Sequence, residues 1–195
     1  EVGIIGASGY TGAELLRLLS RHPYADVAYA TAHAHAGERV GDLYPHLWPV
    51  EDLYFEGFEV AEALRRAEAF FICLPHGEAM QVVPPLLEGG ARVFDLSADF
   101  RLRDASVYLE WYGVEHVAPS LLGEAVYGLP EMEREALRGA RLVAVPGCYP
   151  TAALLALAPV LRRGWLKDGV VIIDAKSGVS GAGRGLSLET HYPQC

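Results

Sequence analysis

The sequence predicts an α/β fold in which a doubly wound, Rossmann-type parallel sheet comes first and the start of a second α+β domain follows. Three observations support this prediction. Short apolar runs alternate with helix-like stretches, a glycine-rich turn joins the first run to the first helix, and polar residues gather where apolar runs end. With 195 residues, of which 51% are hydrophobic and 21% charged, the chain can bury the core of one domain and part of another.

A glycine-rich turn connects the first expected strand, Val2–Ile5, to a helix expected over residues 13–19. Gly6 permits the tight turn, Gly9 lets the backbone approach a pyrophosphate, and Gly12 lets the helix pack closely. The spacing is G-x-x-G-x-x-G, whereas the commonest dinucleotide fingerprint is G-x-G-x-x-G. The place of the turn between a strand and an amphipathic helix nevertheless favours dinucleotide binding, with the phosphates at the helix N-terminus.

The end of the second expected strand, residues 26–31, is where such folds select their cofactor. An acidic residue there would bind the ribose 2′-hydroxyl of NAD. The chain has Ala32 and His33 instead, which favours NADP. His33 and His35 have no further metal ligands nearby in the sequence, so we expect loop histidines that contact solvent or a phosphate, and no metal.

The middle of the first domain begins with a stretch that lacks a clear period, residues 39–58, to which we assign no role. Further elements are expected as a helix over Val60–Arg66, a strand over residues 69–74, a helix over residues 78–87 and a strand over residues 92–96. His76 follows the strand at residues 69–74. It either lines the cofactor cleft or is satisfied within its own turn.

A polar cluster of Ser97, Asp99 and Arg101 follows the strand at residues 92–96. Either Asp99 simply holds Arg101 within the loop, or Arg101 offers its guanidinium to an anionic substrate. We favour a substrate site at Ser97 and Arg101, because the cluster lies beyond a strand end and near the expected cleft.

The rest of the first domain, which we expect to bind the dinucleotide and to span residues 1–147, mixes helical and irregular stretches. Residues 102–120 are expected to be partly helical, with Tyr108, Trp111 and Tyr112 packed against the core. A short helix over residues 132–137 and a strand over residues 141–145 follow.

One cysteine follows that last strand, at the start of a helix. Pro146 and Gly147 end the strand, Cys148 comes next, and the apolar stretch at residues 151–161 predicts a buried helix. Unsatisfied N–H groups and the positive end of the helix dipole stabilise a thiolate at such a position, so Cys148 is the candidate nucleophile. A lone cysteine is more often a small buried side chain, and we expect this of Cys73.

The second domain, residues 148–195, looks like the incomplete start of a substrate-binding unit. A buried strand is expected over residues 170–174, followed by a loop, residues 176–184, with three glycines, two serines and two flanking cations. The backbone N–H groups of such a loop can hold an anion, although a flexible linker has a similar composition. We favour the anion-binding loop because it follows a buried strand directly. Cys195 is expected to be incidental.

The composition argues against several classes of function. The chain has 16 basic and 25 acidic residues, a formal net charge of -9, and no basic run of the kind that binds nucleic acid. No apolar run approaches membrane-spanning length and no signal-type segment precedes the first strand, so we expect a cytoplasmic protein without a membrane partner. Three widely spaced cysteines suit a reducing compartment.

Six motifs occur in order along the chain: GASGYTG at Gly6, LPHG at Leu74, DLSADFRL at Asp95, YGLPE at Tyr127, PGCYPT at Pro146 and KSGVSGAGR at Lys176. Together they closely resemble the N-acetyl-gamma-glutamyl-phosphate reductases of arginine biosynthesis, within the semialdehyde dehydrogenase superfamily. The resemblance implies NADPH-dependent reduction of a small-molecule acyl phosphate to a semialdehyde, with phosphate release, through a thioester on Cys148. It also implies a homo-oligomer, a dimer or a tetramer, formed through the second domain.

The resemblance also implies roles for individual residues. The backbone and side chains that would hold the cofactor phosphates are Ser8, Gly9, Tyr10, Thr11 and Gly12. Ser180 and Gly181 would approach the nicotinamide.

The chain departs from the family's pattern in two places. The family commonly has a Ser-Arg pair where this chain has Ala32 and His33, so the grip on a 2′-phosphate would depend on a weaker, pH-dependent cation. The family also continues past residue 195, through a segment that carries its acid–base histidine. We therefore expect this chain alone to turn over poorly.

Two other interpretations stay open. A related acyl-phosphate reductase or semialdehyde dehydrogenase, of aspartate or aminoadipate type, would share the fold and the thiol. A non-catalytic nicotinamide-binding regulator would make Cys148 a structural residue. The motifs at Pro146 and Lys176 favour the arginine-pathway enzyme.

Overall fold

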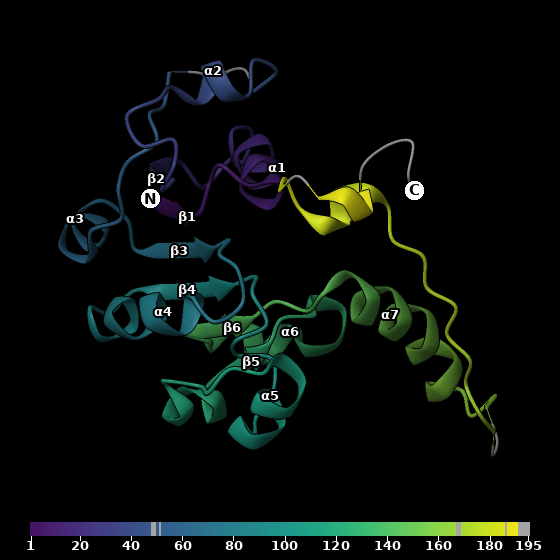
Figure 1. Ribbon diagram of the computed structural model, residues 1–195. Helices are drawn as coiled ribbons and strands as arrows, with labels where there is room; N and C mark the ends of the chain where they lie inside the picture. The colour runs from purple at the N-terminus through teal and green to yellow at the C-terminus, as the bar shows by residue number, and fades with distance from the viewer. Residues whose placement is uncertain (48–49, 51, 167–168, 186, 191–195) are drawn as a thin grey trace.

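Six strands of the computed structural model, which describes residues 1–47, 50, 52–166, 169–185 and 187–190, form one parallel sheet (Figure 1). The strand order is β2-β1-β3-β4-β6-β5. The strands are β1 (Val2–Ile5), β2 (Val27–Thr31), β3 (Ala69–Ile72), β4 (Arg92–Asp95), β5 (Val126–Tyr127) and β6 (Leu142–Ala144). The predicted doubly wound α/β sheet is confirmed.

In the described part of the chain, each of the six strands is followed by at least one helix. They are α1 (Tyr10–Leu19), α2 (Val40–Leu43), α3 (Val60–Arg66), α4 (Ala79–Glu88), α5 (Ala105–Tyr112), α6 (Pro130–Gly139) and α7 (Cys148–Arg162). Helix α3 has the predicted bounds. Helix α1 begins three residues before the predicted start, because Gly9 is extended (φ -80°, ψ 169°) and serves as the N-cap.

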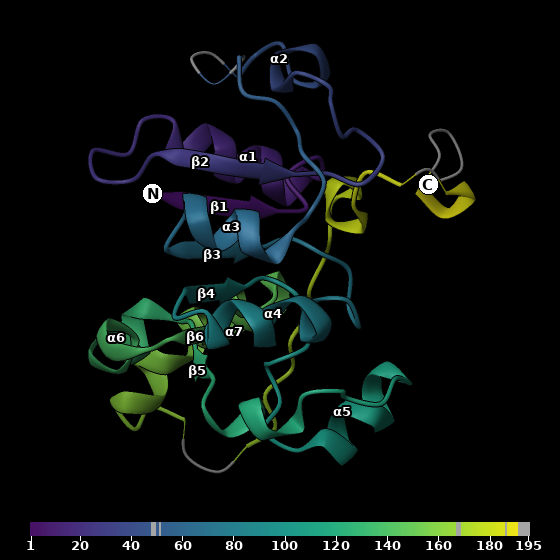
Figure 2. The same cartoon turned by 90° about the vertical axis from the view of Figure 1, so that its left-hand side faces the viewer.

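Two apolar clusters lie against the sheet, and Figure 2 shows α3 and α4 in front of the strands and α1 behind them. The larger cluster includes Phe70 and Ile72 of β3 together with residues of α3 and α4. The smaller one joins Ile4 of β1 to Leu16 of α1. Because both faces are covered, the strands are near-continuous apolar runs, as expected for a parallel sheet.

The described part of residues 39–58, a stretch without a predicted role, completes the smaller cluster. Val40, Tyr44, Leu47 and Phe55 are each at most 7% exposed and pack with α1. The segment also continues the sheet edge through a parallel bridge between Thr31 and Glu56. It therefore covers a face of the sheet that α1 alone would leave open.

The chain leaves β1 and β3 in opposite directions across the sheet, since β2 lies on one side of β1 and β3 on the other. In doubly wound sheets, a crevice opens at such a switch point, beyond the carboxyl ends of the strands. The glycine-rich turn after β1 and the loop after β3 therefore flank one crevice.

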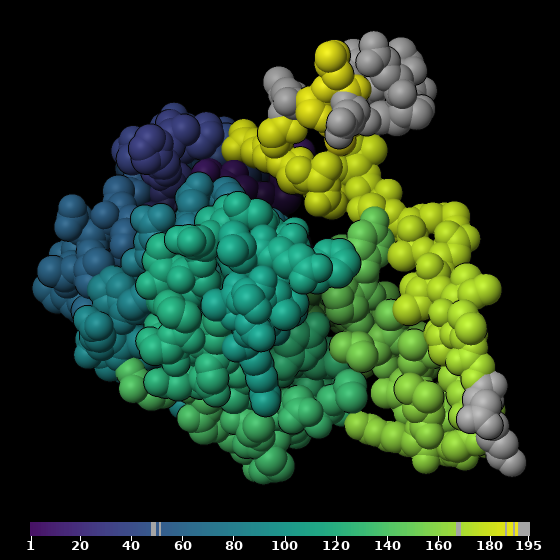
Figure 3. All heavy atoms as spheres, turned by 60° about the horizontal axis from the view of Figure 1, so that its bottom comes forward, coloured from purple at the N-terminus to yellow at the C-terminus, as the bar shows by residue number. Residues whose placement is uncertain are grey.

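Two predictions for the second domain are wrong. Helix α7 begins at Cys148, so Pro150 lies inside it, and the predicted burial is not observed because α7 has no buried residue. Residues 170–174 do not form a buried strand, and Val170 and Ile172 are 91% and 88% exposed. These side chains stay largely in solvent, and Figure 3 shows the chain from α7 onward standing out from the rest as an arm.

The predicted packing of the α5 aromatic residues is correct for Tyr108 and wrong for Trp111. Tyr108 is fully buried and stacks on Tyr112 with ring centroids 4.8 Å apart, whereas Trp111 is 74% exposed. Tyr112 is 36% exposed and packs on Tyr108 at the edge of the core, so its predicted packing is only partial.

Candidate active site

The glycine-rich turn needs glycine at two positions. Gly6 has φ +85°, and a Cβ there would lie 2.6 Å from the carbonyl oxygen of Cys73. A Cβ at Gly12 would lie 2.5 Å from the Cα atom of Ala7. The first glycine thus allows the turn to pass β3, and the third allows α1 to pack against the turn, as predicted.

The glycine-rich turn is hydrogen-bonded to β2 through its first residues, whereas the N–H groups at the start of α1 stay available to a ligand. The N–H groups of Gly6 and Ala7 donate to Thr31, at 3.2 Å to the hydroxyl and 2.7 Å to the carbonyl oxygen. The helix ladder begins with Ala13 N–H to Gly9 O (2.9 Å), so the first N–H groups of α1 have no helical acceptor. A Cβ at Gly9 would meet only Gly6 O, at 3.7 Å. An anion can therefore approach this backbone closely.

A groove of about 680 Å³ runs along this turn and reaches Cys148. It brings together most of the predicted cofactor residues, which are Gly6, Ser8, Gly9, Tyr10, Thr11, His33, Ser180 and Gly181. Gly12 is buried beneath the turn instead. The volume and the lining of the groove suit a dinucleotide. The free N–H groups of the glycine-rich turn can bind its phosphates, and the thiol of Cys148 lies farther along the same groove.

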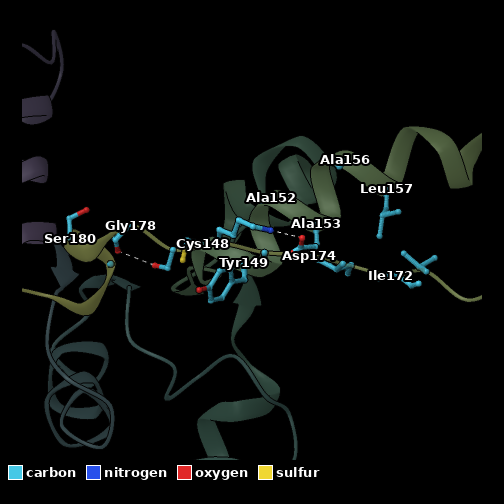
Figure 4. Close-up of a pocket in the computed structure, with 16 residues that line it drawn as sticks. Cys148, Tyr149, Ala152, Ala153, Ala156, Leu157, Ile172, Asp174, Gly178 and Ser180 are labelled. Carbon is cyan, nitrogen blue, oxygen red and sulfur yellow. Dashed lines mark hydrogen bonds and ion pairs between the residues drawn. The ribbon is translucent and has the colours of Figure 1, made fainter. Parts of the chain in front are cut away.

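Cys148 is the first residue of α7 and is exposed at the joint between the two parts of the chain. Gly147 is the N-cap, and Thr151 N–H donates to Gly147 O at 3.0 Å. The sulfur lies between the groove and a second hollow of about 710 Å³ beside α7, with Ser180 on the facing segment (Figure 4). A thiol at an open helix N-terminus is placed to act as a nucleophile.

Cys73 also lines the groove, yet its environment differs from that of Cys148. Burial, with a smaller contribution from the Asp95 carboxylate, raises the pKa of Cys73 to about 12. The thiol therefore stays protonated at neutral pH and packs, half-buried, against the smaller apolar cluster, so the prediction of a core cysteine is correct only in part. Cys195 lies outside the described residues.

Arg101 braces the turn that precedes Cys148. Its Nε donates to Val145 O at 2.7 Å and its Nη2 to Leu96 O at 2.8 Å. Its Nη1 lies 3.2 Å from the position of a Cβ added to Gly147. The guanidinium thus reaches the residue before the thiol, and its side chain is not paired with Asp99.

Asp99 has other partners, which correct the idea that it holds Arg101. It accepts hydrogen bonds from Gly77 N–H (2.8 Å), Met80 N–H (3.0 Å) and the Tyr108 hydroxyl (2.7 Å). It is fully buried and caps the turn before α4. Its role in the folded chain is to join the loops after β3 and β4.

Ser97 is also buried, at 2% exposure, and its hydroxyl lies between two aspartates. It donates to Asp95 Oδ2 at 2.9 Å and accepts from Asp99 N–H at 3.0 Å. Burial raises the pKa of Asp95 to about 6, although both hydrogen bonds from Ser97 lower it. These contacts assign Ser97 a part in shaping the loop that carries Arg101.

His76 does not belong to the groove lining of the described residues. Its Nδ1 accepts from Ala98 N–H at 3.2 Å, and its ring meets Tyr112 edge-on at 5.3 Å. The ring is therefore satisfied by the neighbouring loop, neither in the cleft nor within its own turn.

Sequence reasoning missed two residues that contact the glycine-rich turn, Tyr44 and Arg184. The Tyr44 hydroxyl donates to Ser8 O at 2.6 Å, and Arg184 Nη1 donates to the same oxygen at 3.1 Å. In the sequence, Arg184 stands out only as a cation flanking the loop at residues 176–184. Nothing in the aperiodic stretch around Tyr44 pointed to the site.

Among the described residues, no helix is long and apolar enough to cross a membrane. Within the same part of the chain, no three His, Cys, Asp or Glu side chains lie close enough together to hold a metal ion.

Two family models match the sequence. The model for the semialdehyde dehydrogenase NAD binding domain matches residues 1–140, and the model for the semialdehyde dehydrogenase dimerisation domain matches residues 148–195.

Curated relatives match the whole chain. The N-acetyl-gamma-glutamyl-phosphate reductase of Desulforudis audaxviator is 53% identical over 100% of this chain and 56% of its own length. The protein of the same name from Halorhodospira halophila is 56% identical over 98% of this chain and 56% of its own length. The chain thus spans about half the length of the curated relatives it matches.

Solved structures show the same fold at low identity. Aspartate semialdehyde dehydrogenase II from Vibrio cholerae has a TM-score of 0.59 at 19% identity, over 84% of this chain and 42% of that protein. Aspartate semialdehyde dehydrogenase with NADP from Candida albicans has a TM-score of 0.56 at 15% identity, over 83% and 46%.

Proposed function

The chain belongs to the semialdehyde dehydrogenase family, and we propose that it is the cofactor-binding and thiol-bearing part of an NADPH-dependent N-acetyl-gamma-glutamyl-phosphate reductase. One observation carries the proposal: the exposed Cys148, at the start of α7, shares a groove with the glycine-rich turn. The thiol and the bound dinucleotide would then meet at one carbon of the substrate.

The groove would hold the dinucleotide through the N–H groups at the start of α1, with His33 at the adenosine end and Ser180 and Gly181 at the nicotinamide end. When bound, the reduced nicotinamide supplies a hydride. We infer NADP as the preferred cofactor, because the end of β2 presents Ala32 and His33 and no carboxylate.

Cys148 would perform the covalent step. Its thiolate sulfur forms a bond to the acyl carbon, the bond from that carbon to the phosphate oxygen breaks, and phosphate leaves with the electron pair. The resulting thioester is reduced by two electrons to the aldehyde, and the thiolate is released. We propose that Arg101, whose Nη1 reaches Gly147, orients the anionic substrate, and that Ser97 supports it by shaping the loop.

The comparisons support the acetylglutamyl substrate over the aspartyl one. Relatives at 46–56% identity carry the N-acetyl-gamma-glutamyl-phosphate reductase name, whereas the aspartate semialdehyde dehydrogenase structures are 14–19% identical. We further propose that residues 1–147 form the dinucleotide-binding domain and residues 148–195 begin the catalytic one. The match to a dimerisation domain supports a homo-oligomer, and we expect a cytoplasmic location.

Alkylation of Cys148 tests the proposal in the full-length protein. We expect rapid labelling by iodoacetamide near neutral pH and slower labelling when acyl phosphate is present. Cys73 should be labelled much more slowly, since its half-buried thiol stays protonated at neutral pH. Slow labelling of Cys148, unaffected by acyl phosphate while NADPH still binds, would favour the non-catalytic regulator.

A direct assay separates the related enzymes. Oxidation of NADPH is followed with N-acetyl-gamma-glutamyl phosphate and with aspartyl phosphate at equal concentrations. A higher kcat/KM for the acetylglutamyl substrate is expected, and a higher kcat/KM for aspartyl phosphate would contradict the proposed substrate.

A further inference from the structure

We propose that Arg184 binds the pyrophosphate of the dinucleotide, and so ties the loop that carries Ser180 and Gly181 to the glycine-rich turn. The inference rests on the proposed function only in requiring that the groove binds a nicotinamide dinucleotide. It adds a binding residue from the far end of the chain.

Arg184 touches the turn although 176 residues separate it from Ser8. Its Nη1 donates to Ser8 O at 3.1 Å, and its guanidinium carbon lies 5.5 Å from the ring centroid of Tyr44. Tyr44 is 7% exposed and its hydroxyl donates to the same Ser8 oxygen at 2.6 Å. The guanidinium is therefore held between the turn and an aromatic face, which orients it.

These contacts leave most of the guanidinium available. A guanidinium carries five N–H donors, and the hydrogen bond to Ser8 O uses one of them. Among the described residues, no carboxylate lies within 4.0 Å of Arg184. The remaining donors can therefore serve an anion.

The charge of the groove lining favours this assignment. Among the described residues that line the groove, Arg184 is the one with a permanent positive charge, while Glu78 brings a negative charge. A pyrophosphate brings negative charge to the same place. The helix N-terminus of α1 offers partial charges only, so a guanidinium beside it adds substantially to the attraction.

The position of Arg184 selects the pyrophosphate over the ribose 2′-phosphate. Arg184 contacts Ser8, which lies in the turn at the start of α1, where the phosphates of a dinucleotide bind in this fold. The 2′-phosphate binds beyond the end of β2, where this chain has Ala32 and His33. Because NADPH and NADH share the pyrophosphate, Arg184 should serve both equally.

The experiment compares NADPH and NADH binding to the full-length protein by fluorescence titration. For Arg184→Ala we expect Kd to rise about tenfold for each cofactor, the loss of one charge-assisted contact. Arg184→Lys should recover part of this loss, because it restores the charge without the planar fork. Arg163→Ala is the matched control, since Arg163 also stacks on an aromatic ring, Trp165, at 5.1 Å but lies outside the groove lining.

Each other outcome has a distinct meaning. A loss confined to NADPH would overturn the pyrophosphate assignment in favour of the 2′-phosphate. Unchanged affinity of Arg184→Ala for both cofactors, or an equal loss in Arg163→Ala, would overturn the inference while leaving the proposed function intact. If the wild-type protein bound neither dinucleotide, the proposed function would fall, and this inference with it.

Discussion

Residues 69–74 and 170–174 are both apolar runs, but the first contains a buried strand and the second is exposed. In β3, Phe70 and Ile72 are fully buried, with strands on both sides and residues of α3 and α4 packed over them. In the later stretch, Val170 and Ile172 are 91% and 88% exposed. The difference shows that an apolar run becomes a strand only when neighbouring strands accept its hydrogen bonds and other elements cover its side chains.

The same contrast divides the whole molecule. Every buried apolar side chain that the structure describes lies between Val2 and Ala144. Helix α7 has none, although its sequence is rich in leucine and alanine. The first region, residues 1–147, thus forms its own core, while the described part of the second contributes the thiol, one loop and apolar side chains that remain open.

Cys148→Ser tests whether the first region binds the cofactor while the second supplies the reactive thiol. A serine hydroxyl has no comparable fraction of anion, so we expect reduction by the full-length protein to fall on the order of 10³-fold or more. The affinity for NADPH should stay, because the groove near the glycine-rich turn is unchanged. Stopped-flow rates and fluorescence titration measure the two quantities, and retained activity would rule out the covalent mechanism.

Phe70→Ala and Ile172→Ala sharpen the contrast in stability. Loss of the buried Phe70 ring should reduce the free energy of unfolding of the 195-residue chain by about 3–5 kcal/mol. Ile172→Ala should change it by less than about 0.5 kcal/mol, because that side chain is already in water. Urea denaturation followed by circular dichroism measures both, and equal losses would show that residues 170–174 are packed in solution.

Asp95→Asn tests whether the buried Asp95 carboxyl makes the free energy of unfolding depend on pH. Burial raises the pKa of Asp95 from 3.8 to about 6, so between these pH values the folded chain binds a proton that the unfolded chain has released. The free energy of unfolding should therefore fall as the pH rises from about 4 to about 6, by about 3 kcal/mol at most.

Asparagine cannot titrate, so the variant should lack this component. Urea melts of both proteins at pH 4 and pH 6.5 give the difference, in which the contributions of other carboxylates cancel. The same pH dependence in both proteins would contradict the assignment to Asp95.

His33→Ala gives the smallest expected effect and tests cofactor choice within the first region. His33 is exposed and lines the groove beyond the end of β2. Its removal should weaken NADPH binding roughly fivefold more than NADH binding, because only NADPH has a 2′-phosphate there. His35→Ala is a suitable control, since His35 contacts Glu38 at 3.0 Å. Equal weakening of both cofactors would place the 2′-phosphate elsewhere.

The sequence predicted what local pattern and strand direction decide. Helix α3 and the strands were found because their periodicity and apolar runs are local signals. The groove was predicted because the carboxyl ends of parallel strands lie at one edge, which brings Ser8 and Cys148 together from distant parts of the chain.

The features that the sequence did not predict depend on partners that are distant in sequence. Tyr44 lies in an aperiodic segment, so its contact with Ser8 gave no local signal. His76 and Asp99 find partners 22 residues apart, in each other's loops, which no spacing reveals. The exposure of Ile172 depends on what covers it, a property of the surroundings that composition does not encode.

The turn before Cys148 is anchored to the sheet by Arg101. Arg101 fastens Val145, three residues before the thiol, to Leu96 at the end of β4. Cys148 directly follows this turn, so its backbone is anchored next to the sheet even though α7 has no buried residue. The proposed nucleophile would therefore take its position from the first region, where the dinucleotide would bind.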